Sequence, residues 1–321
     1  MLCLSIRTIR GSDFPSIVDL WNETHPYDPL TPRMFKRKVL LDVNFDPEDF
    51  FVAENKEKMV GFVYVVRRLC PLDNEVSPIF TTGWVNGFGV LADAPSETAS
   101  LLLTKVDCFA KEYGLEKLCA TAYSPFYFTQ GFDTEHEADY IRAFLAAGYK
   151  SSGISYARDI DLLSYIAPKS IHTARQDAEA AGFSFGALRD ELIIPFWNYM
   201  NKYQSAGWRN RIRKLMYDTD DFGRIRVATY QGEVIGFCVF HDPDGSPERF
   251  GPFGIRDCFR GRKLGQILLA DCLTEMKRRG LHNAWMQWTE SGNAADHIYQ
   301  SAGFTISRSH MILEKNIGRA L

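Results

Sequence analysis

At 321 residues the chain is long enough for two domains with buried cores, and its 45% apolar and 24% charged composition is ordinary for a globular protein. The net charge of −3 argues against a general attraction to nucleic acid, and no apolar run approaches the length of a membrane span. The seven cysteines are scattered without a C-x-x-C pair, which predicts reduced thiols and a cytoplasmic location. The seven histidines show no metal-ligand spacing, so no metal is expected.

The first half predicts a strand, two helices, a two-stranded hairpin, then a strand, a helix, a strand, a helix and closing strands. A polar turn at 55–58 precedes Val60-Gly61-Phe62, which marks the hairpin. Residues 154–160 alternate between apolar and polar and predict a last strand.

The same landmarks return in the second half in the same order. Their offsets run from 155 residues (148 to 303) to 175 residues (60 to 235). An ordered set of four matches indicates an internal duplication. Each copy predicts an α/β (α+β) domain with a mixed sheet. The matched pairs are Val60-Gly61-Phe62 with Ile235-Gly236-Phe237, Phe88-Gly89-Val90 with Phe253-Gly254-Ile255, Gly114-Leu115 with Gly280-Leu281, and Gly148-Tyr149 with Gly303-Phe304.

The boundary between the copies is predicted near 163–169, which gives domains at 1–165 and 166–321. Pro168 begins a polar helix that runs to about Ala181, and residues 182–186 open the second domain as a strand. No Gly/Ser-rich linker separates the copies, so we expect the domains to pack together.

The most informative segment is 251–266. An apolar strand ends at Ile255, a short basic loop follows, and an apolar helix opens at about Leu264. Backbone N–H groups at a helix start lack partners within the helix and carry partial positive charge. This order of elements predicts a site for a diphosphate, and Arg260, Arg262 and Lys263 add cationic donors.

This segment resembles the acetyl-CoA loop of the GNAT family (Gcn5-related N-acetyltransferases), whose pattern is Arg/Gln-x-x-Gly-x-Gly/Ala between a strand and a long helix. Here the loop runs from Arg260 to Gly265, and Lys263 stands where the family has its first glycine. A left-handed φ at Lys263 would make this departure costly.

A second stretch, 293–304, resembles the family's Asn-x-x-Ala-x-x-x-Tyr-x-x-x-Gly-Phe helix. Tyr299 stands five residues before Phe304, as in the family, whereas Asn293 is one residue nearer to the tyrosine than usual. The resemblance implies acetyl-CoA as co-substrate and Tyr299 as the acid that assists the leaving thiolate. The coenzyme-binding residues that it implies are Phe253, Gly254, Ile255, Arg260, Gly261, Arg262, Lys263, Leu264, Gly265, Gln266, Asn293 and Tyr299.

The first half lacks these features. Residues 95–100 replace the basic loop without its cations or glycines, and Glu97 would repel a diphosphate. Phe144 takes the place of Tyr299 and has no proton to donate. The resemblance therefore implies two tandem GNAT-like domains, each a mixed, mostly antiparallel sheet flanked by helices. Domain 1–165 is expected to be degenerate and not to bind coenzyme, and 166–321 to be catalytic.

The reaction implied is transfer of the acetyl group of acetyl-CoA to an amine of a small molecule or peptide. Glu248 at the start of the coenzyme strand and Glu290 at the end of the next strand are both candidates for the general base. No nucleic-acid or membrane partner is expected. The alternative function is a non-catalytic acyl-CoA sensor or interaction module, which the replacement of a glycine by Lys263 would favour.

Overall fold

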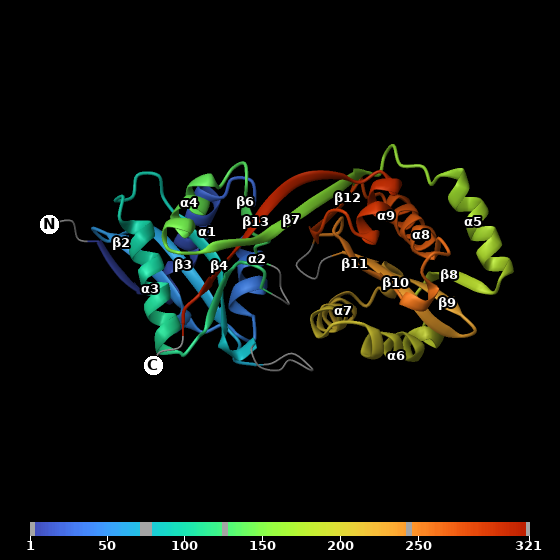
Figure 1. Ribbon diagram of the computed structural model, residues 1–321, viewed down its shortest axis with the longest axis horizontal. Coiled ribbons are helices and arrows are strands. Elements are labelled where there is room, and N and C mark those ends of the chain that lie inside the picture. The colour runs from blue at the N-terminus through green and yellow to red at the C-terminus, as the bar shows by residue number, and fades with distance from the viewer. Residues whose placement is uncertain (1–3, 71–78, 124–127, 242–245, 319–321) are drawn as a thin grey trace. The chain divides into compact units, whose positions relative to one another are not determined.

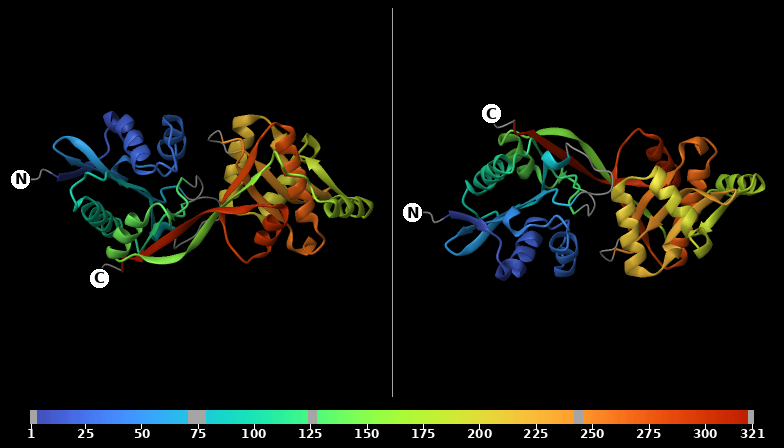
Figure 2. Two further views of the ribbon diagram at one scale, coloured as in Figure 1. Left: turned by 90° about the horizontal axis from the view of Figure 1, so that it is seen from above. Right: turned by 90° about the horizontal axis from the view of Figure 1, so that it is seen from below.

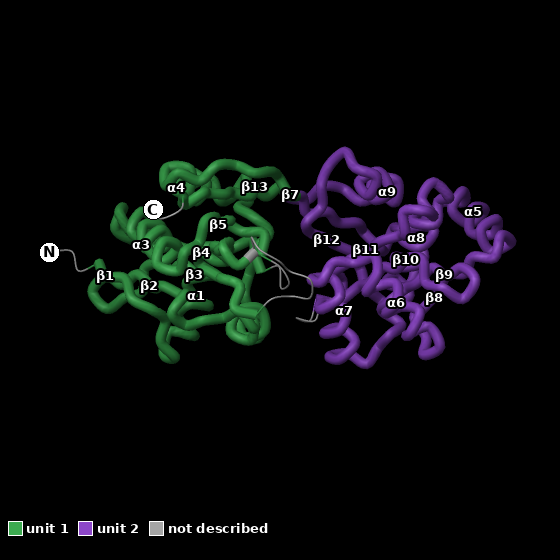
Figure 3. The backbone as a smooth tube through the Cα atoms, turned by 60° about the horizontal axis from the view of Figure 1, so that its bottom comes forward, with its two compact units in different colours: residues 1–155, 309–321 green, residues 156–308 purple. Residues whose placement is uncertain are grey.

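The computed structural model describes residues 4–70, 79–123, 128–241 and 246–318 and divides the chain into two compact units. Unit 1 comprises residues 1–155 with 309–321, and unit 2 comprises 156–308 (Figure 3). Within the described part of the chain, none of the helices has the length and apolar character needed to cross a membrane.

Unit 1 is built on a mixed sheet in the order β1-β2-β3-β4-β5-β13, in which β4 and β5 are parallel and the other neighbours antiparallel (Figure 1). Short β6 pairs with β13. The elements that lie in this unit, wholly or in part, are β1 (Leu4–Thr8), α1 (Phe14–Thr24), α2 (Pro32–Phe35), β2 (Phe50–Asn55), β3 (Lys58–Arg67), β4 (Thr82–Val90), α3 (Thr98–Glu112), β5 (Lys117–Ala120), β6 (Phe132–Asp133), α4 (Ala138–Ala146), β7 (Lys150–Asp161) and β13 (Thr305–Asn316).

Unit 2 repeats this order around an antiparallel sheet, β11-β10-β9-β8, while β12 pairs antiparallel with the last part of β7. Helices α6 and α7 cover one face of the sheet, and α5, α8 and α9 cover the other (Figures 1 and 2). Its elements are α5 (Lys169–Ala180), β8 (Phe183–Ala187), α6 (Ile193–Tyr203), α7 (Ala206–Thr219), β9 (Ile225–Tyr230), β10 (Glu233–Phe240), β11 (Phe250–Ile255), α8 (Leu264–Arg278), β12 (Asn283–Thr289) and α9 (Ala294–Ala302).

The hairpin turns confirm the predicted repeat at the level of the backbone. Lys56 and Glu57 connect β2 to β3, Gln231 and Gly232 connect β9 to β10, and all four have left-handed φ. Two consecutive residues with left-handed φ form the turn whose twist suits a tight hairpin.

The glycine that follows each hairpin turn has the same packing role in both units. A Cβ on Gly61 would lie 3.0 Å from the carbonyl oxygen of Gly89, and a Cβ on Gly236 would lie 2.9 Å from that of Gly254. Both glycines therefore let the third strand approach the fourth more closely than a side chain would allow.

Two strands divide their residues between the units. Strand β7 follows α4 of unit 1, yet its residues 156–161 pair with β12 of unit 2. Strand β13 follows α9 of unit 2, yet its residues 313–316 pair with β5 of unit 1. The compact units thus differ from a simple division after residue 165, because each receives a strand from the other half of the sequence.

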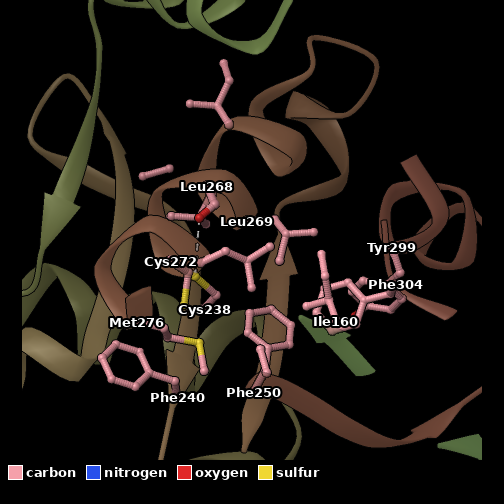
Figure 4. Close-up of a cluster of buried hydrophobic side chains, with 14 of the residues drawn as sticks. Ile160, Cys238, Phe240, Phe250, Leu268, Leu269, Cys272, Met276, Tyr299 and Phe304 are labelled. Atoms are coloured by element: carbon pink, nitrogen blue, oxygen red, sulfur yellow. Dashed lines mark hydrogen bonds between the residues drawn. The ribbon is translucent and has the colours of Figure 1, made fainter. Parts of the chain in front are cut away.

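The core of unit 2 lies on both faces of its sheet. One cluster joins α8 and α9 to β10, β11 and β12, and the other joins α6 and α7 to β9 and β10. In the first cluster, Cys272 of α8 lies beside Cys238 of β10 (Figure 4). Because α8 buries one face along its whole length, its first turn is held in place at the end of β11.

Candidate coenzyme and acyl-transfer site

Strand β11 has an open edge toward β12. It is the outermost strand of the four-stranded sheet, and it meets β12 through an isolated parallel bridge between Arg249 and Trp285 before the two strands separate. The N–H of Arg256 donates to the carbonyl oxygen of Ile235 on β10. Because N–H groups of successive residues in a strand point to opposite sides, the N–H groups of Phe253 and Ile255 point toward the open edge. An extended chain that carries amide groups can pair with such an edge.

The basic loop connects this strand to α8. Gly261 has φ of 79° and Lys263 has φ of 59°, so both take left-handed backbone. Lys263 is the N-cap residue, but its side chain makes no capping hydrogen bond. The first N–H groups of α8, which begins at Leu264, lack partners within the helix.

The loop cations are exposed. Arg260 pairs with Asp257 at 2.7 Å, and their side chains are 66% and 84% exposed. The guanidinium of Arg262 lies 6.0 Å from the ring centre of Phe259. An exposed pair of this kind contributes little to stability, so Arg260 can exchange its carboxylate for a phosphate at small cost.

Gly265 packs the first turn of α8 against its surroundings. A Cβ at this position would lie 3.3 Å from Ile298 of α9 and 3.3 Å from Phe253 of β11. The glycine therefore allows the strand end, the helix start and α9 to meet closely. Gln266, the next residue, donates to the hydroxyl of Ser301 on α9 at 3.3 Å.

The corresponding helix start in unit 1 has none of this geometry. Helix α3 has Glu97 as its N-cap with right-handed helical φ and ψ, and no residue from 91 to 97 has positive φ. Glu97 thus places a carboxylate at the start of α3.

Tyr299 lies on the α8 and α9 side of strand β11 and is 9% exposed. Its ring centre is 6.2 Å from that of Phe253, 6.3 Å from that of Phe250 and 5.9 Å from that of Phe304, and Figure 4 shows it beside Phe304 and Ile160. Burial raises the pKa of Tyr299 well above its usual value, which keeps the phenol protonated.

Phe144 of unit 1 has the position of Tyr299 in its own unit. It is fully buried, with its ring centre 5.1 Å from that of Phe88 and 4.9 Å from that of Tyr149. These two neighbours correspond to Phe253 and Phe304 in the sequence repeat. The two helices thus carry equivalent rings, and the hydroxyl is present in unit 2.

A second tyrosine stands on the opposite face of β11 and was not foreseen from the sequence. Tyr199 of α6 is 2% exposed, and its hydroxyl accepts a hydrogen bond from Nε2 of Gln204 at 2.7 Å. A Cβ on Gly254 would lie 3.3 Å from that Gln204 nitrogen and 3.5 Å from the Tyr199 oxygen. Burial raises the pKa of Tyr199 well above its usual value. Its only sequence signal is an aromatic residue on an amphipathic helix, which also describes a core residue.

The loop between β12 and α9 is fixed by a polar cap. The side chain of Asn293 accepts from the N–H of Asp296 at 2.9 Å, and Asp296 accepts from the N–H of Gly292 at 2.7 Å. Asn293 thus acts as the N-cap of α9. Glu290 is exposed at the end of β12 and accepts from Asn293 at 3.3 Å.

Glu248 lies before the point at which β11 and β12 separate. One of its carboxylate oxygens accepts from the backbone N–H groups of His282 at 2.9 Å and Asn283 at 3.1 Å. These bonds hold the turn that leads into β12. The structure therefore keeps the two predicted bases, Glu248 and Glu290, at opposite ends of β12.

A groove opens beside the first turn of α8 in unit 2. Its lining comes from α5, α8, α9 and the segment that precedes α5, and includes Gln266, Ile298 and Ser301. Its mixed polar and apolar lining lies next to the predicted phosphate loop.

Comparisons with known proteins agree with this geometry. Residues 186–304 match the model of the acetyltransferase (GNAT) family. The glucosamine N-acetyltransferase region of a fungal multi-domain beta-N-acetylglucosaminidase superposes with a TM-score of 0.77 at 17% identity, over 98% of this chain and 38% of that chain. The present chain thus spans well under half of that enzyme's length. No curated protein matches the sequence.

Two further solved structures match over nearly their full length. A tandem GNAT protein from the clavulanic acid biosynthesis pathway has a TM-score of 0.67 at 15% identity, over 99% of this chain and 100% of that chain. A GCN5-related N-acetyltransferase from Sphaerobacter thermophilus has a TM-score of 0.65 at 16% identity, over 99% and 97%.

The fold is thus that of two tandem acetyltransferase-like units. Residues 186–304 match the GNAT acetyltransferase family model and the solved structures share the tandem fold, which confirms the resemblance read from the sequence and the predicted fold class.

Proposed function

We propose that the protein is an N-acetyltransferase that binds one acetyl-CoA in unit 2 and transfers the acetyl group to an amine of a small molecule or peptide. The observation that carries the proposal is the difference between the two helix starts. Unit 2 joins an open strand edge to a loop with two left-handed residues and three exposed cations. Unit 1 presents Glu97 at the same place.

The residues of unit 2 suit the two ends of acetyl-CoA. The N–H groups at the start of α8, with Arg260, Arg262 and Lys263, would hold the diphosphate. The edge N–H groups of Phe253 and Ile255 would pair with the amide-bearing arm. Acetyl-CoA supplies an acetyl thioester, which an amine can attack when it is neutral.

The chain's own groups then have distinct tasks. An N–H at the open edge of β11 can donate to the carbonyl oxygen as negative charge develops on it. Tyr299 can donate its phenol hydrogen bond to the departing sulfur, and its raised pKa ensures that the proton is present.

A base or a water chain must accept the amine proton. The bonds of Glu248 to two backbone N–H groups tie its carboxylate to the turn before β12. Glu290 is exposed at the far end of that strand, past the separation from β11, so we favour Glu290 for this task.

The coenzyme site is tested by calorimetric titration with acetyl-CoA, for which we expect one site per chain. Arg260→Ala should weaken binding about 10-fold or more, because a charge-assisted hydrogen bond to phosphate is lost. The matched control is Arg142→Ala in unit 1, since Arg142 is also exposed and pairs with Asp139 three residues earlier. Two sites per chain, or equal losses in both variants, would place the coenzyme elsewhere.

Turnover is tested by release of the CoA thiol over a panel of amines. Glucosamine belongs in the panel because the fungal region above is named a glucosamine N-acetyltransferase, together with amino acids and peptide N-termini. Tight coenzyme binding without thiol release over the whole panel would favour the alternative of a non-catalytic acyl-CoA sensor.

A further inference from the structure

A buried ion pair connects strand β7 to the helix that carries Tyr299. Nη2 of Arg158 on β7 lies 2.6 Å from Oδ1 of Asp296 on α9, and the two side chains are 1% and 2% exposed. Nε of Arg158 also donates to the hydroxyl of Thr289 on β12 at 3.1 Å. One guanidinium thus contacts both elements that flank the loop at 290–293, through a hydrogen bond to β12 and an ion pair with α9.

The carboxylate of Asp296 accepts several hydrogen bonds at the start of α9. Besides its ion pair with Arg158, it accepts hydrogen bonds from the N–H of Gly292 at 2.7 Å, from Nε2 of Gln300 at 2.8 Å and from the hydroxyl of Ser291 at 3.3 Å. The hydrogen bond from Gly292 and the Arg158 charge help to hold the pKa of Asp296 below its usual value, so the carboxylate stays ionised. The start of α9 is therefore fixed by directional bonds.

The same strand also contacts the other end of α9. Ile160, two residues after Arg158 and on the same face of β7, has its Cδ1 3.3 Å from the position of a Cβ on Gly303. Figure 4 shows Ile160 against Phe304 and Tyr299. Strand β7 therefore holds α9 at its start through Arg158 and at its end through Ile160.

Tyr299 lies one turn after Asp296 and faces the rings of Phe250 and Phe253 on the coenzyme strand. Residues three apart on a helix are neighbours on its surface. A small rotation of α9 about its axis would carry the Tyr299 hydroxyl away from the edge of β11, and apolar contacts alone resist such a rotation weakly because they lack direction.

We propose that Arg158 is a positioning residue for acyl transfer, which through Asp296 sets where Tyr299 stands against β11. The inference rests on the proposed function and adds to it a residue that lies outside the family match at 186–304. A fully buried ion pair adds little net stability compared with apolar side chains of similar size. The attraction between Arg158 and Asp296, together with the hydrogen bond from Arg158 to Thr289, accounts better for the pair's presence at this helix start.

The test removes both charges together, because Arg158→Met alone would leave Asp296 buried without its cation and could prevent folding. The variant Arg158→Met with Asp296→Leu should fold and bind acetyl-CoA as the parent does, since the loop at 260–265 is untouched. Its kcat should fall about 10²-fold, the typical effect of a displacement near 1 Å at a reacting group.

A double-mutant cycle separates positioning from a general loss of order. Tyr299→Phe should lower kcat strongly in the parent. In the variant with Arg158→Met and Asp296→Leu, here called the charge-free variant or background, the hydroxyl is already misplaced, so Tyr299→Phe should lower kcat by less than about 2-fold. Arg158→Lys as a single change should keep part of the parent's kcat, because a lysine can still pair with Asp296. The control is Arg279→Met with Asp221→Leu, which removes a pair 2.6 Å apart elsewhere in unit 2 and should leave kcat unchanged.

Hydrogen exchange supplies a readout that needs no turnover. In the charge-free variant, amides of α9 should exchange at least about 10-fold faster while those of α8 keep their rates. A parent that transfers no acetyl group, together with this change in exchange, would overturn the proposed function and support the positioning of α9. Unchanged α9 exchange, or an undiminished effect of Tyr299→Phe in the charge-free background, would overturn the inference.

Discussion

Two tyrosine hydroxyls flank strand β11, one on each face of the sheet. Tyr299 packs against Phe250 and Phe253 on the α8 and α9 side, and Tyr199 lies beside Gly254 on the α6 side. Gln204 donates to the Tyr199 oxygen, which leaves the Tyr199 proton free to turn toward a ligand at the strand. Under the proposed function, we assign the Tyr299 hydroxyl to the leaving sulfur and the Tyr199 hydroxyl to the acceptor amine.

Replacing each tyrosine by phenylalanine distinguishes these roles. Tyr299→Phe keeps the packing, so acetyl-CoA affinity should hardly change, while the single-turnover rate should fall about 10²–10⁴-fold if proton donation limits the reaction. Tyr199→Phe should act mainly on the KM for the amine. Rapid-quench kinetics and calorimetry on both variants check this, and a full single-turnover rate in Tyr299→Phe would make Tyr299 a packing residue.

Lys263 stands where the GNAT pattern has a glycine, and its backbone has a conformation that favours glycine. Its φ of 59° is the conformation that a glycine adopts without strain, and a non-glycine residue held there costs about 1–3 kcal/mol. Lys263→Gly should relieve this strain, offset in part by about 0.5–1 kcal/mol from the freer unfolded chain. The free energy of unfolding should therefore rise by between about 0 and 2.5 kcal/mol.

The comparison with Lys263→Ala isolates the charge. Alanine keeps the strain and removes the cation, so both variants should lose coenzyme affinity while Lys263→Gly alone gains stability. Urea denaturation followed by circular dichroism measures the difference. Equal stability of the two variants would show that the backbone at 263 is not strained.

At the scale of single residues, the sequence indicated the groups that lie close together along the chain. The loop at 260–265 and Tyr299 follow local patterns, so they could be found from spacing alone. Arg158 could not, because its partner is 138 residues away (296 minus 158) and a lone arginine in a strand carries no signal of its own. Tyr199 shares its pattern with ordinary core aromatics.

Among the elements, the close packing of β10 against β11 positions the open edge of β11. A Cβ on Gly236 would lie 2.1 Å from Cδ1 of Ile255 and 2.9 Å from the carbonyl oxygen of Gly254. Because the second contact is with backbone, a side chain here must push β11 away from its neighbour. The predicted repeat of Gly61 and Gly236 has this physical cause.

Gly236→Ala should therefore destabilise unit 2 by about 1–3 kcal/mol, the usual effect of overpacking, and should weaken acetyl-CoA binding. The control is Gly186→Ala on β8, where an added Cβ would meet nothing within 4 Å. Thermal unfolding and calorimetry on the two variants provide the measurement. Equal stability in both would mean that β11 adjusts freely to the extra methyl group.

Hairpins, helix boundaries and the order of elements were predictable because each depends on neighbours in sequence. Helix α8 begins at Leu264 as expected, and helix α5 at Lys169–Ala180 agrees with the expected limits near 168–181. Strand partners depend on residues far away in the chain, and the alternating pattern of β7 carries no information about which strand lies beside it.

The whole molecule is therefore not two independent copies joined end to end. Unit 2 takes residues 156–161 of β7 as the partner of β12, and unit 1 takes residues 313–316 of β13 as the partner of β5. Neither half of the sequence cut at 165 contains all the strands of a unit. The repeat predicted a boundary between two separate copies. Sequence similarity shows where each repeat begins and ends, but it does not show which strands pair with each other.

This exchange predicts the behaviour of a chain that is cut between the copies. A protease site inserted after Ile166, which is 82% exposed, allows cleavage of the folded protein. The fragments should remain together, because separation would remove β7 from β12 and β13 from β5 and leave the N–H and C=O groups of both edges without strand partners. Size-exclusion chromatography should show one species at the mass of the intact chain, 36.6 kDa.

Denaturant then distinguishes exchanged strands from simple docking. If the strands are exchanged, the fragments should separate over the same urea range in which circular dichroism reports loss of the sheets, since each fragment completes the other's fold. The uncut chain with the same insertion controls for the inserted sequence, and the cut protein should still bind one acetyl-CoA. Separation of two folded fragments at urea concentrations well below this transition would contradict the strand exchange.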